Sequence, residues 1–334
     1  MFDKIISEGT RNNIAKRREN NIKTLFGLPY KQDIDGEDFV VLGVPYDTSV
    51  TNRTGCRFGP RAIRNAYGAG RLSYEQDNSY KVANLKGMDM GDIGVVLGYV
   101  EETMELIRES VRKVLDADAV PIVLGGDHLI AYAELKAYSE KYGKVAMVHF
   151  DTHEDTWDYG DRIKYNHGTP FRNAIEDDIL DTEHSIQVGI RSGGDTYRIK
   201  YAQDHGMKVI TARELHNIGI KETCRRIKEQ VGDAKVFITF DIDFLDPVYA
   251  PGTGTPMPGG FSTYEACEII RNGLAGLDIV GFDLVEVMEN YDPAGITAIN
   301  AVAILKQFVI LLSKKKSGAG IIGKVGVRYG KMSI

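Results

Sequence analysis

Residues that bind metal ions gather at three places in this 334-residue sequence, each directly after a short apolar run. The first cluster is Gly125-Gly126-Asp127-His128, the second is Asp151-Thr152-His153-Glu154-Asp155, and the third is Asp241-Ile242-Asp243. Carboxylates and imidazoles are ligands for divalent transition-metal ions. The three clusters together predict a metal site of the kind that activates water for hydrolysis.

The spacing inside the second and third clusters has a geometric meaning. Side chains at positions i and i+2 of an extended strand point to the same face. Asp151, His153 and Asp155 are therefore expected to converge, and so are Asp241 and Asp243. The histidine of the first cluster is expected to arrive from a separate strand, where two glycines allow a tight turn.

Four carboxylates in one small site need compensating positive charge. If Asp151, Asp155, Asp241 and Asp243 were all ionised, their repulsion would force at least one to bind a proton. Two divalent cations would neutralise all four, with bridging carboxylates holding the ions ~3.5–4 Å apart. The mixed imidazole and carboxylate set favours manganese, with nickel as the alternative, and no cysteine lies in these segments.

Each cluster on its own has a simpler interpretation. The first fits an ordinary strand-end turn, and aspartates such as those of the third often cap a following helix. The second is harder to explain structurally, because three ligand-type residues alternate in it. The order of the three clusters, each after an apolar strand, favours the metal site. The remaining histidines are interpreted as structural: His149 within its strand, and the isolated His184, His205 and His216.

Strands that alternate with helical patterns would position these clusters at one edge of a parallel sheet. The predicted strands are Phe39–Gly43, Ala119–Leu124, Val145–Phe150, Ser185–Gly189, Val209–Thr211, Val236–Phe240 and Ile279–Val285. Most are continuous apolar runs, as expected for strands buried on both faces. Ligands of such sheets bind beyond the carboxyl ends of the strands, which is where the clusters lie.

Helical periodicity appears between the strands. Apolar residues from Met104 to Leu115 recur at helical spacing, and Ser262 to Glu265 form a capping box before a second amphipathic helix. Ile296–Leu312 is the last predicted helix. With no internal repeat or linker, residues 1–334 are predicted to form a single domain. Its core spans about residues 36–312, between an N-terminal arm (1–35) and a C-terminal tail (313–334).

Composition excludes several classes of protein. The net charge of −6 and the absence of basic clusters away from the chain ends argue against a nucleic-acid partner. No apolar run approaches the ~18 residues of a membrane span, so no membrane partner is expected. Three widely spaced cysteines and the lack of a signal-like N-terminus favour a reducing, cytoplasmic location.

The clusters and their surroundings resemble the arginase–agmatinase family of ureohydrolases, most closely agmatinases. The most specific match is the stretch FDIDFLDPVYAPGTGTPMPGG at residues 240–260. Further matches are GVPYD (Gly43–Asp47), GCRFGPRAIR (Gly55–Arg64), HGTPF (His167–Phe171), VGIR (Val188–Arg191) and VEV (Val285–Val287). The resemblance implies a three-layer α/β fold with a central, mostly parallel eight-stranded sheet, assembled as homotrimers or homohexamers.

The resemblance also implies a role for each site residue. One metal ion would be held by His128, Asp151, Asp155 and Asp241, and the second by His153, Asp151, Asp241 and Asp243. Glu286 would grip the guanidinium group, and His167 would carry a proton to the leaving amine. Asp155 would orient the attacking water.

The expected reaction is hydrolysis of agmatine to putrescine and urea. HGTPF replaces the Ser-Gly-Asn type segment with which arginases hold an amino acid head group, which favours a substrate without an α-carboxylate. Trp157 is expected to pack against the alkyl chain, although an ordinary surface loop would explain it equally well. Thr152, Met288 and Glu289 depart from the family pattern near the expected pocket.

Other functions stay open. The same chemistry could act on guanidinobutyrate, guanidinopropionate, guanidine or arginine. A bulky Met288 would favour a small substrate, and Glu289 would disfavour a carboxylated one. A non-catalytic, metal-holding member of the family is disfavoured, because all six ligands and His167 are present. A related-fold deacetylase is weaker still, since it would need one zinc ion and would have no use for His128 together with the Asp241–Asp243 pair.

Overall fold

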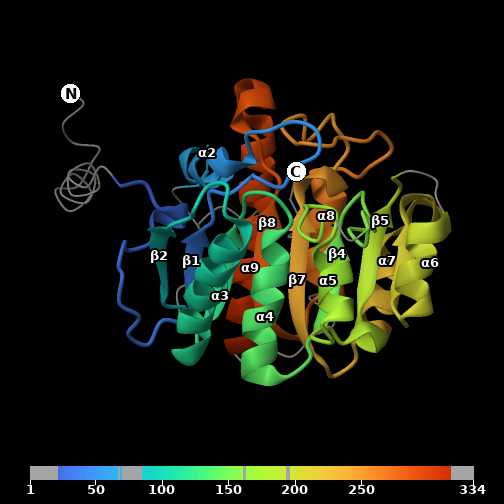
Figure 1. Ribbon diagram of the computed structural model, residues 1–334, viewed down its shortest axis with the longest axis horizontal. Helices are drawn as coiled ribbons and strands as arrows, with labels where there is room; N and C mark the ends of the chain where they lie inside the picture. Colours follow the sequence, from blue (N-terminus) through green and yellow to red (C-terminus); the bar gives the residue numbers. More distant parts are fainter. Residues whose placement is uncertain (1–21, 67, 70–84, 161–162, 193–195, 317–334) are drawn as a thin grey trace, which may run out of the picture.

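The computed structural model describes residues 22–66, 68–69, 85–160, 163–192 and 196–316. Within them, eight strands form one sheet in the order β2-β1-β3-β8-β7-β4-β5-β6, and all neighbouring strands are parallel (Figure 1). The strands are β1 (Phe39–Gly43), β2 (Gly87–Asp92), β3 (Val120–Leu124), β4 (Ala146–Phe150), β5 (Ile186–Ile190), β6 (Lys208–Thr211), β7 (Lys235–Asp241) and β8 (Asp278–Val285). The predicted eight-stranded parallel sheet is confirmed.

The sequence pattern missed one strand, β2. Its segment GMDMGD is not an apolar run, because β2 lies at the edge of the sheet. On one side it pairs with β1, and on the other it forms only a single bridge, between Asp89 and Tyr30. Asp89 in this strand is nevertheless fully buried, and its carboxylate accepts hydrogen bonds from the Arg64 side chain at 2.8 and 2.9 Å. A buried ion pair, and not an apolar pattern, anchors this edge.

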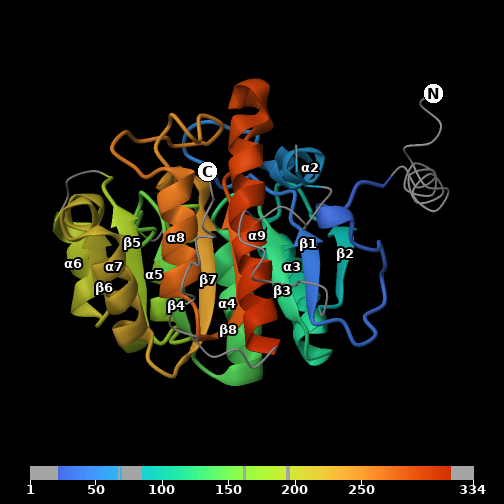
Figure 2. The same cartoon turned by 180° about the vertical axis from the view of Figure 1, so that it is seen from behind.

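Helices cover both faces of the sheet and form the two outer layers. They are α2 (Gly59–Asn65), α3 (Val100–Asp116), α4 (Ile130–Tyr142), α5 (Pro170–Glu176), α6 (Thr196–Asp204), α7 (Ala212–Val231), α8 (Thr263–Gly273) and α9 (Ile296–Lys316). Helices α3, α4 and α5 lie in front of the sheet in Figure 1, and α7, α8 and α9 cover the opposite face in Figure 2. The capping box at Ser262 and Glu265 starts α8 as predicted.

The sheet divides the hydrophobic core into two parts. Val41 and Val148 point into the core under α7, α8 and α9, whereas their neighbours Val40 and Met147 point into the core under α3 and α4. Because successive side chains of a strand alternate between faces, both sets must be apolar. The continuous apolar runs of the sequence follow from this arrangement.

Helix α9 corrects one expectation from the sequence. The stretch Pro293–Ser313 is long and apolar enough to cross a membrane, although no such segment was expected. In the folded chain 67% of its most apolar window is buried, and Phe308 stacks on Phe282 of β8 with 4.4 Å between ring centroids. Its apolar composition is that of a core helix.

Part of the predicted N-terminal arm packs on the domain. Leu25 and Phe26 are buried, and the Leu25 N–H donates to the Asp89 carboxylate at 2.8 Å. Residues 1–21 of the arm and residues 317–334 of the predicted tail lie outside the described residues.

The loops that follow β1, β3, β4, β7 and β8 meet at one edge of the sheet. In Figure 1 the blue loop after β1 and the orange loop after β7 lie together at the top of the molecule. A hydrogen bond of 2.9 Å from the Asn52 amide to the Gly254 carbonyl oxygen joins these two loops. The three metal-binding clusters lie at this edge.

Candidate metal centre and active site

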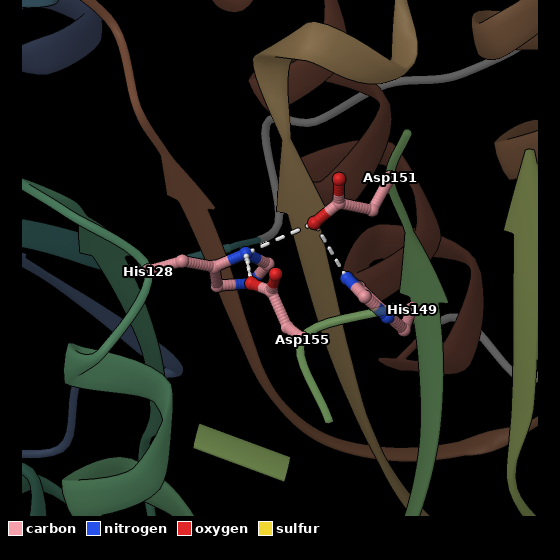
Figure 3. Close-up of side chains that lie close together, drawn as sticks. All are labelled: His128, His149, Asp151 and Asp155. Atoms are coloured by element: carbon pink, nitrogen blue, oxygen red, sulfur yellow. Dashed lines mark hydrogen bonds and ion pairs between the residues drawn. The ribbon is translucent and has the colours of Figure 1, made fainter. Parts of the chain in front are cut away.

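The first group of site residues surrounds the ring of His128. Its Nδ1 atom lies 3.0 Å from Asp151 Oδ2 and 2.9 Å from Asp155 Oδ2 (Figure 3). Asp241 Oδ2 lies 3.5 Å from the same nitrogen. All four side chains are almost completely buried, yet Nδ1 makes no well-directed hydrogen bond with any described residue. A buried nitrogen that faces three carboxylate oxygens in this way forms with them a fitting set of ligands for a cation.

Two contacts fix the orientation of His128. Its Nε2 atom lies 2.8 Å from the Thr239 hydroxyl, so a proton on Nε2 leaves the Nδ1 lone pair directed at the carboxylates. The ring also packs edge-on against Phe171 of α5, with 5.3 Å between centroids. The neighbouring Gly126 lies so close to Tyr46 that a Cβ atom would stand 1.7 Å from the Tyr46 carbonyl oxygen.

The second group shares Asp151 with the first. His153 Nδ1 lies 3.4 Å from Asp151 Oδ1 and 3.2 Å from Asp243 Oδ2. The Asp243 N–H donates to Asp241 Oδ1 at 2.8 Å, which holds the third cluster together. A carboxylate shared between two groups of metal-binding side chains is the arrangement that two neighbouring cations require.

The residues converge as predicted, but not for the predicted reason. Strand β4 ends at Phe150, so residues 151–155 form a turn and not an extended strand. Asp155 turns back through a left-handed backbone conformation with φ 51°. Asp241 ends β7, whereas Asp243 lies in a short 3-10 helix, Ile242–Phe244. Neither glycine before Asp127 has positive φ, and Gly126 is required by close packing.

His149 contacts the cluster, although its position within a strand of the sequence had indicated a purely structural residue. Its Nε2 atom lies 2.7 Å from Asp151 Oδ2 (Figure 3), and its Nδ1 atom lies 3.1 Å from the Gln187 amide nitrogen. Burial lowers the pKa of His149, so the neutral ring accepts from Gln187 and donates to Asp151. The i, i+2 spacing from Asp151 was the signal that could have found it.

Without cations, the carboxylates of the site would be difficult to ionise together. Burial, followed by the charges of Asp243 and Asp151, raises the pKa of Asp241 well above its ordinary value. Burial also raises the pKa of Asp243 to about 6, against the opposing effect of His153. These residues fit a binuclear divalent metal site, because two cations would supply the missing positive charge.

A third group lies beside the metal cluster. Glu286 follows β8, is 1% exposed, and accepts from the His128 N–H at 3.1 Å through Oε1. The same oxygen lies 3.1 Å from His167 Nδ1. Glu286 Oε2 is buried without a hydrogen-bond partner among the described residues. Burial lowers the pKa of His167, but the hydrogen bond and charge of Glu286 outweigh it and raise this pKa to about 9.

Two contacts of this group were not found from the sequence. The Thr51 hydroxyl lies 2.8 Å from His167 Nε2, and the Thr51 N–H donates to the same nitrogen at 3.2 Å. Asp127 is fully buried behind Glu286, and burial followed by the charge of Glu286 raises its pKa to about 8. A threonine in a loop carries no pattern that would distinguish it beforehand.

The two residues predicted to shape the substrate pocket lie near His167 and Glu286. Trp157 packs against Gly168, the neighbour of His167, and lines a cavity of about 360 Å³ together with Arg172 and Glu176. Met288 is fully buried, and its terminal methyl group approaches Gly254 from the side where Glu286 Oε2 also lies. Of the departures from the family pattern, Thr152 is buried and donates from its hydroxyl to the Asp243 carbonyl oxygen at 3.3 Å.

Comparisons with known proteins agree with this geometry. Residues 37–311 match the arginase family. The mitochondrial agmatinase of Gallus gallus is 40% identical over 90% of this chain and 88% of its own length. The mitochondrial guanidino acid hydrolase of Homo sapiens is 37% identical over 89% and 84%. A crystal structure of a hypothetical agmatinase from Burkholderia thailandensis superimposes with a TM-score of 0.82 at 38% identity, covering 90% of this chain and 93% of that one.

Fold, buried histidine–aspartate cluster and family match lead to one conclusion: the chain belongs to the arginase family and is a ureohydrolase that acts on a small guanidino compound.

Proposed function

We propose that the chain hydrolyses agmatine to putrescine and urea. The observation that carries the guanidino part of this proposal is Glu286 Oε2, a carboxylate oxygen buried beside the metal cluster with no hydrogen-bond partner among the described residues. An unpaired buried charge is costly, and a guanidinium N–H would relieve that cost. The substrate supplies the cation that this oxygen lacks.

The proposed ligands of the two metal ions are those expected from the family. His128, Asp151, Asp155 and Asp241 would hold one ion, and His153, Asp151, Asp241 and Asp243 would hold the other. Manganese is the proposed metal and nickel the alternative, because both accept imidazole and carboxylate ligands. When bound, the two ions lower the pKa of a water molecule until it can attack the guanidino carbon near neutral pH.

The protein side chains provide binding, orientation and the proton. Glu286 holds the guanidinium through Oε2, and Asp155 orients the attacking water. His167, hydrogen-bonded to Glu286 through Nδ1, gives a proton to the departing amine, which would otherwise be a poor leaving group. Trp157 and Met288 are proposed to contact the rest of the substrate.

Guanidino acids are the second candidate substrates. The human relative at 37% identity is a guanidino acid hydrolase, so similarity alone does not separate the two classes. Glu289 was expected to repel a carboxylated substrate, but it is exposed and pairs with Arg61 Nη2 at 2.6 Å. Its charge is therefore largely compensated, and this obstacle to a guanidino acid is weaker than the sequence indicated.

A substrate panel decides between these functions. Steady-state kcat/KM for agmatine, guanidinobutyrate, guanidinopropionate, arginine and guanidine is measured by urea release, with manganese and with nickel. We expect agmatine to give the highest value. If another compound exceeds agmatine tenfold, the agmatinase assignment is wrong, whereas the ureohydrolase chemistry stands. No urea from any of the five would contradict the proposed substrate class.

Location and assembly complete the proposal. A cytoplasmic homotrimer or homohexamer is proposed. The composition and cysteine usage support the location, and the resemblance to the family supports the assembly. Size-exclusion chromatography with light scattering would measure the number of chains, and a monomer would contradict the proposed assembly.

A further inference from the structure

The loop Ser49–Asn52, which follows β1, lies directly against the proposed proton donor. Thr51 is exposed, whereas the His167 side chain is only 11% exposed. Thr51 places two groups at His167 Nε2, its hydroxyl at 2.8 Å and its backbone N–H at 3.2 Å. The other ring nitrogen, Nδ1, is occupied by Glu286. The loop thus covers the one side of the imidazole that Glu286 leaves open.

The loop is held in this place from three directions. The Ser49 N–H donates to buried Asp127 at 3.0 Å, and the Ser49 carbonyl oxygen accepts from the His167 N–H at 3.1 Å. The Asn52 amide reaches the Gly254 carbonyl oxygen at 2.9 Å. An exposed loop with so many fixed contacts holds Thr51 at a defined distance from His167.

The two groups of Thr51 differ in what they can do when His167 changes its protonation state. A backbone N–H only donates, so it suits the neutral ring with a lone pair on Nε2. A hydroxyl can donate to that lone pair, and it can also accept from Nε2–H when the ring is protonated. The hydroxyl is therefore the group of Thr51 that can bond to both forms of the imidazole.

We propose that Thr51 is a positioning residue that holds His167 in both protonation states through its hydroxyl group. The proposal rests on the proposed role of His167 as the proton donor. Without the hydroxyl, the protonated ring would keep an opposing N–H at Nε2 and lose its acceptor there. The charged groups that face His167 from other elements are Glu286, Asp155 and Asp127, and a substitution of Thr51 adds or removes none of them.

The test compares Thr51→Val, which keeps the shape and removes the hydroxyl, with Thr51→Ser, which keeps the hydroxyl. In the manganese-loaded enzyme we expect Thr51→Val to lower kcat about tenfold, with little change in KM. Activity that requires protonated His167 falls as pH rises through the pKa of this residue, which the hydrogen bond and charge of Glu286 raise. Thr51→Val should move this fall down by about one pH unit, because the protonated ring is destabilised. Thr51→Ser should restore both.

Two further variants distinguish a failure of the role proposed for Thr51 from a failure of the role proposed for His167. Thr54→Val, which changes an exposed threonine two residues beyond the loop, is the matched control and should behave as the wild type. His167→Asn should slow turnover about 10²–10⁴-fold and remove the alkaline fall. An unchanged profile in His167→Asn would overturn both the proton-donor role and this inference. A slowed His167→Asn with an unaltered profile in Thr51→Val would overturn the inference alone, and so would equal effects of Val and Ser at position 51.

Discussion

Asp155 and Glu286, two residues proposed to act on water and substrate, have left-handed backbone conformations with φ 51° and 64°. Such a conformation costs about 1–3 kcal/mol for a residue with a side chain, and it persists only where the surroundings fix it. The Glu286 N–H donates to the Gly126 carbonyl oxygen at 2.9 Å, and this bond holds the turn after β8. The turn aims the carboxylate sideways at His128 and His167.

The unpaired Oε2 atom of Glu286 leads to a prediction about the variant Glu286→Gln. Glu286→Gln keeps the size of the side chain and removes the charge, so kcat/KM should fall about 10²–10³-fold, as for other groups that stabilise charge in a buried site. Metal content should stay at the wild-type level, since Glu286 is not a proposed ligand. Glu289→Gln, an exposed neighbour, is the matched control and should change kcat/KM less than twofold. Wild-type kcat/KM in Glu286→Gln would contradict its role as the guanidinium anchor.

The positions of whole elements depend on close packing between loops at the carboxyl edge. Gly126 lies against the backbone of Tyr46, and the Asp127 N–H donates to the Tyr46 carbonyl oxygen at 2.8 Å. The loop after β3, which carries His128, is therefore positioned by the loop after β1. This contact explains the glycine better than a tight turn does.

Gly126→Ala tests that contact. The new Cβ atom would have to displace backbone, so His128 should move and manganese affinity should fall at least tenfold, as when the support of a metal ligand is lost. Gly94→Ala is the control, because no atom lies within 4 Å of its added Cβ and its φ is not positive. Affinity is measured by competition with a chelator. Equal affinities in the two variants would show that the packing of Gly126 does not position His128.

Elements with a strong pattern could be predicted from the sequence, and those held by polar contacts could not. Seven strands were found because most of them are apolar runs buried on both faces, whereas β6, at the other edge of the sheet, is a short apolar run that is only partly buried. Strand β2 was missed because a buried Arg64–Asp89 pair anchors it. At the site, the ligand types were visible as clusters, whereas Thr51 was not, because its role depends on a loop that returns to His167. Loop geometry of this kind has no signature in residue spacing.

At the scale of the whole molecule, the site gathers carboxyl groups inside a protein that is already acidic. The net charge is −6, and Asp127, Asp151, Asp241, Asp243 and Glu286 are all buried at the same edge of the sheet. The net negative charge of the protein favours the approach of cations, and bound cations would keep the buried carboxyl groups of the site ionised. Cations that bind only the folded chain also stabilise it, by about 2.7 kcal/mol when their concentration is 100 times the dissociation constant.

Metal binding should therefore be measurable in two ways, as the number of ions per chain and as a higher Tm. We expect about two manganese ions per chain after desalting, and a Tm several degrees higher than that of chelator-treated protein. Asp241→Ala removes the carboxylate proposed to bridge both ions, so it should abolish urea release and the response of Tm to manganese. Asp233→Ala, an exposed aspartate that precedes the same strand at its opposite end, should keep both. One ion per chain at full activity would contradict the binuclear site, because a single divalent cation leaves two of the four aspartate charges uncompensated in a buried cluster.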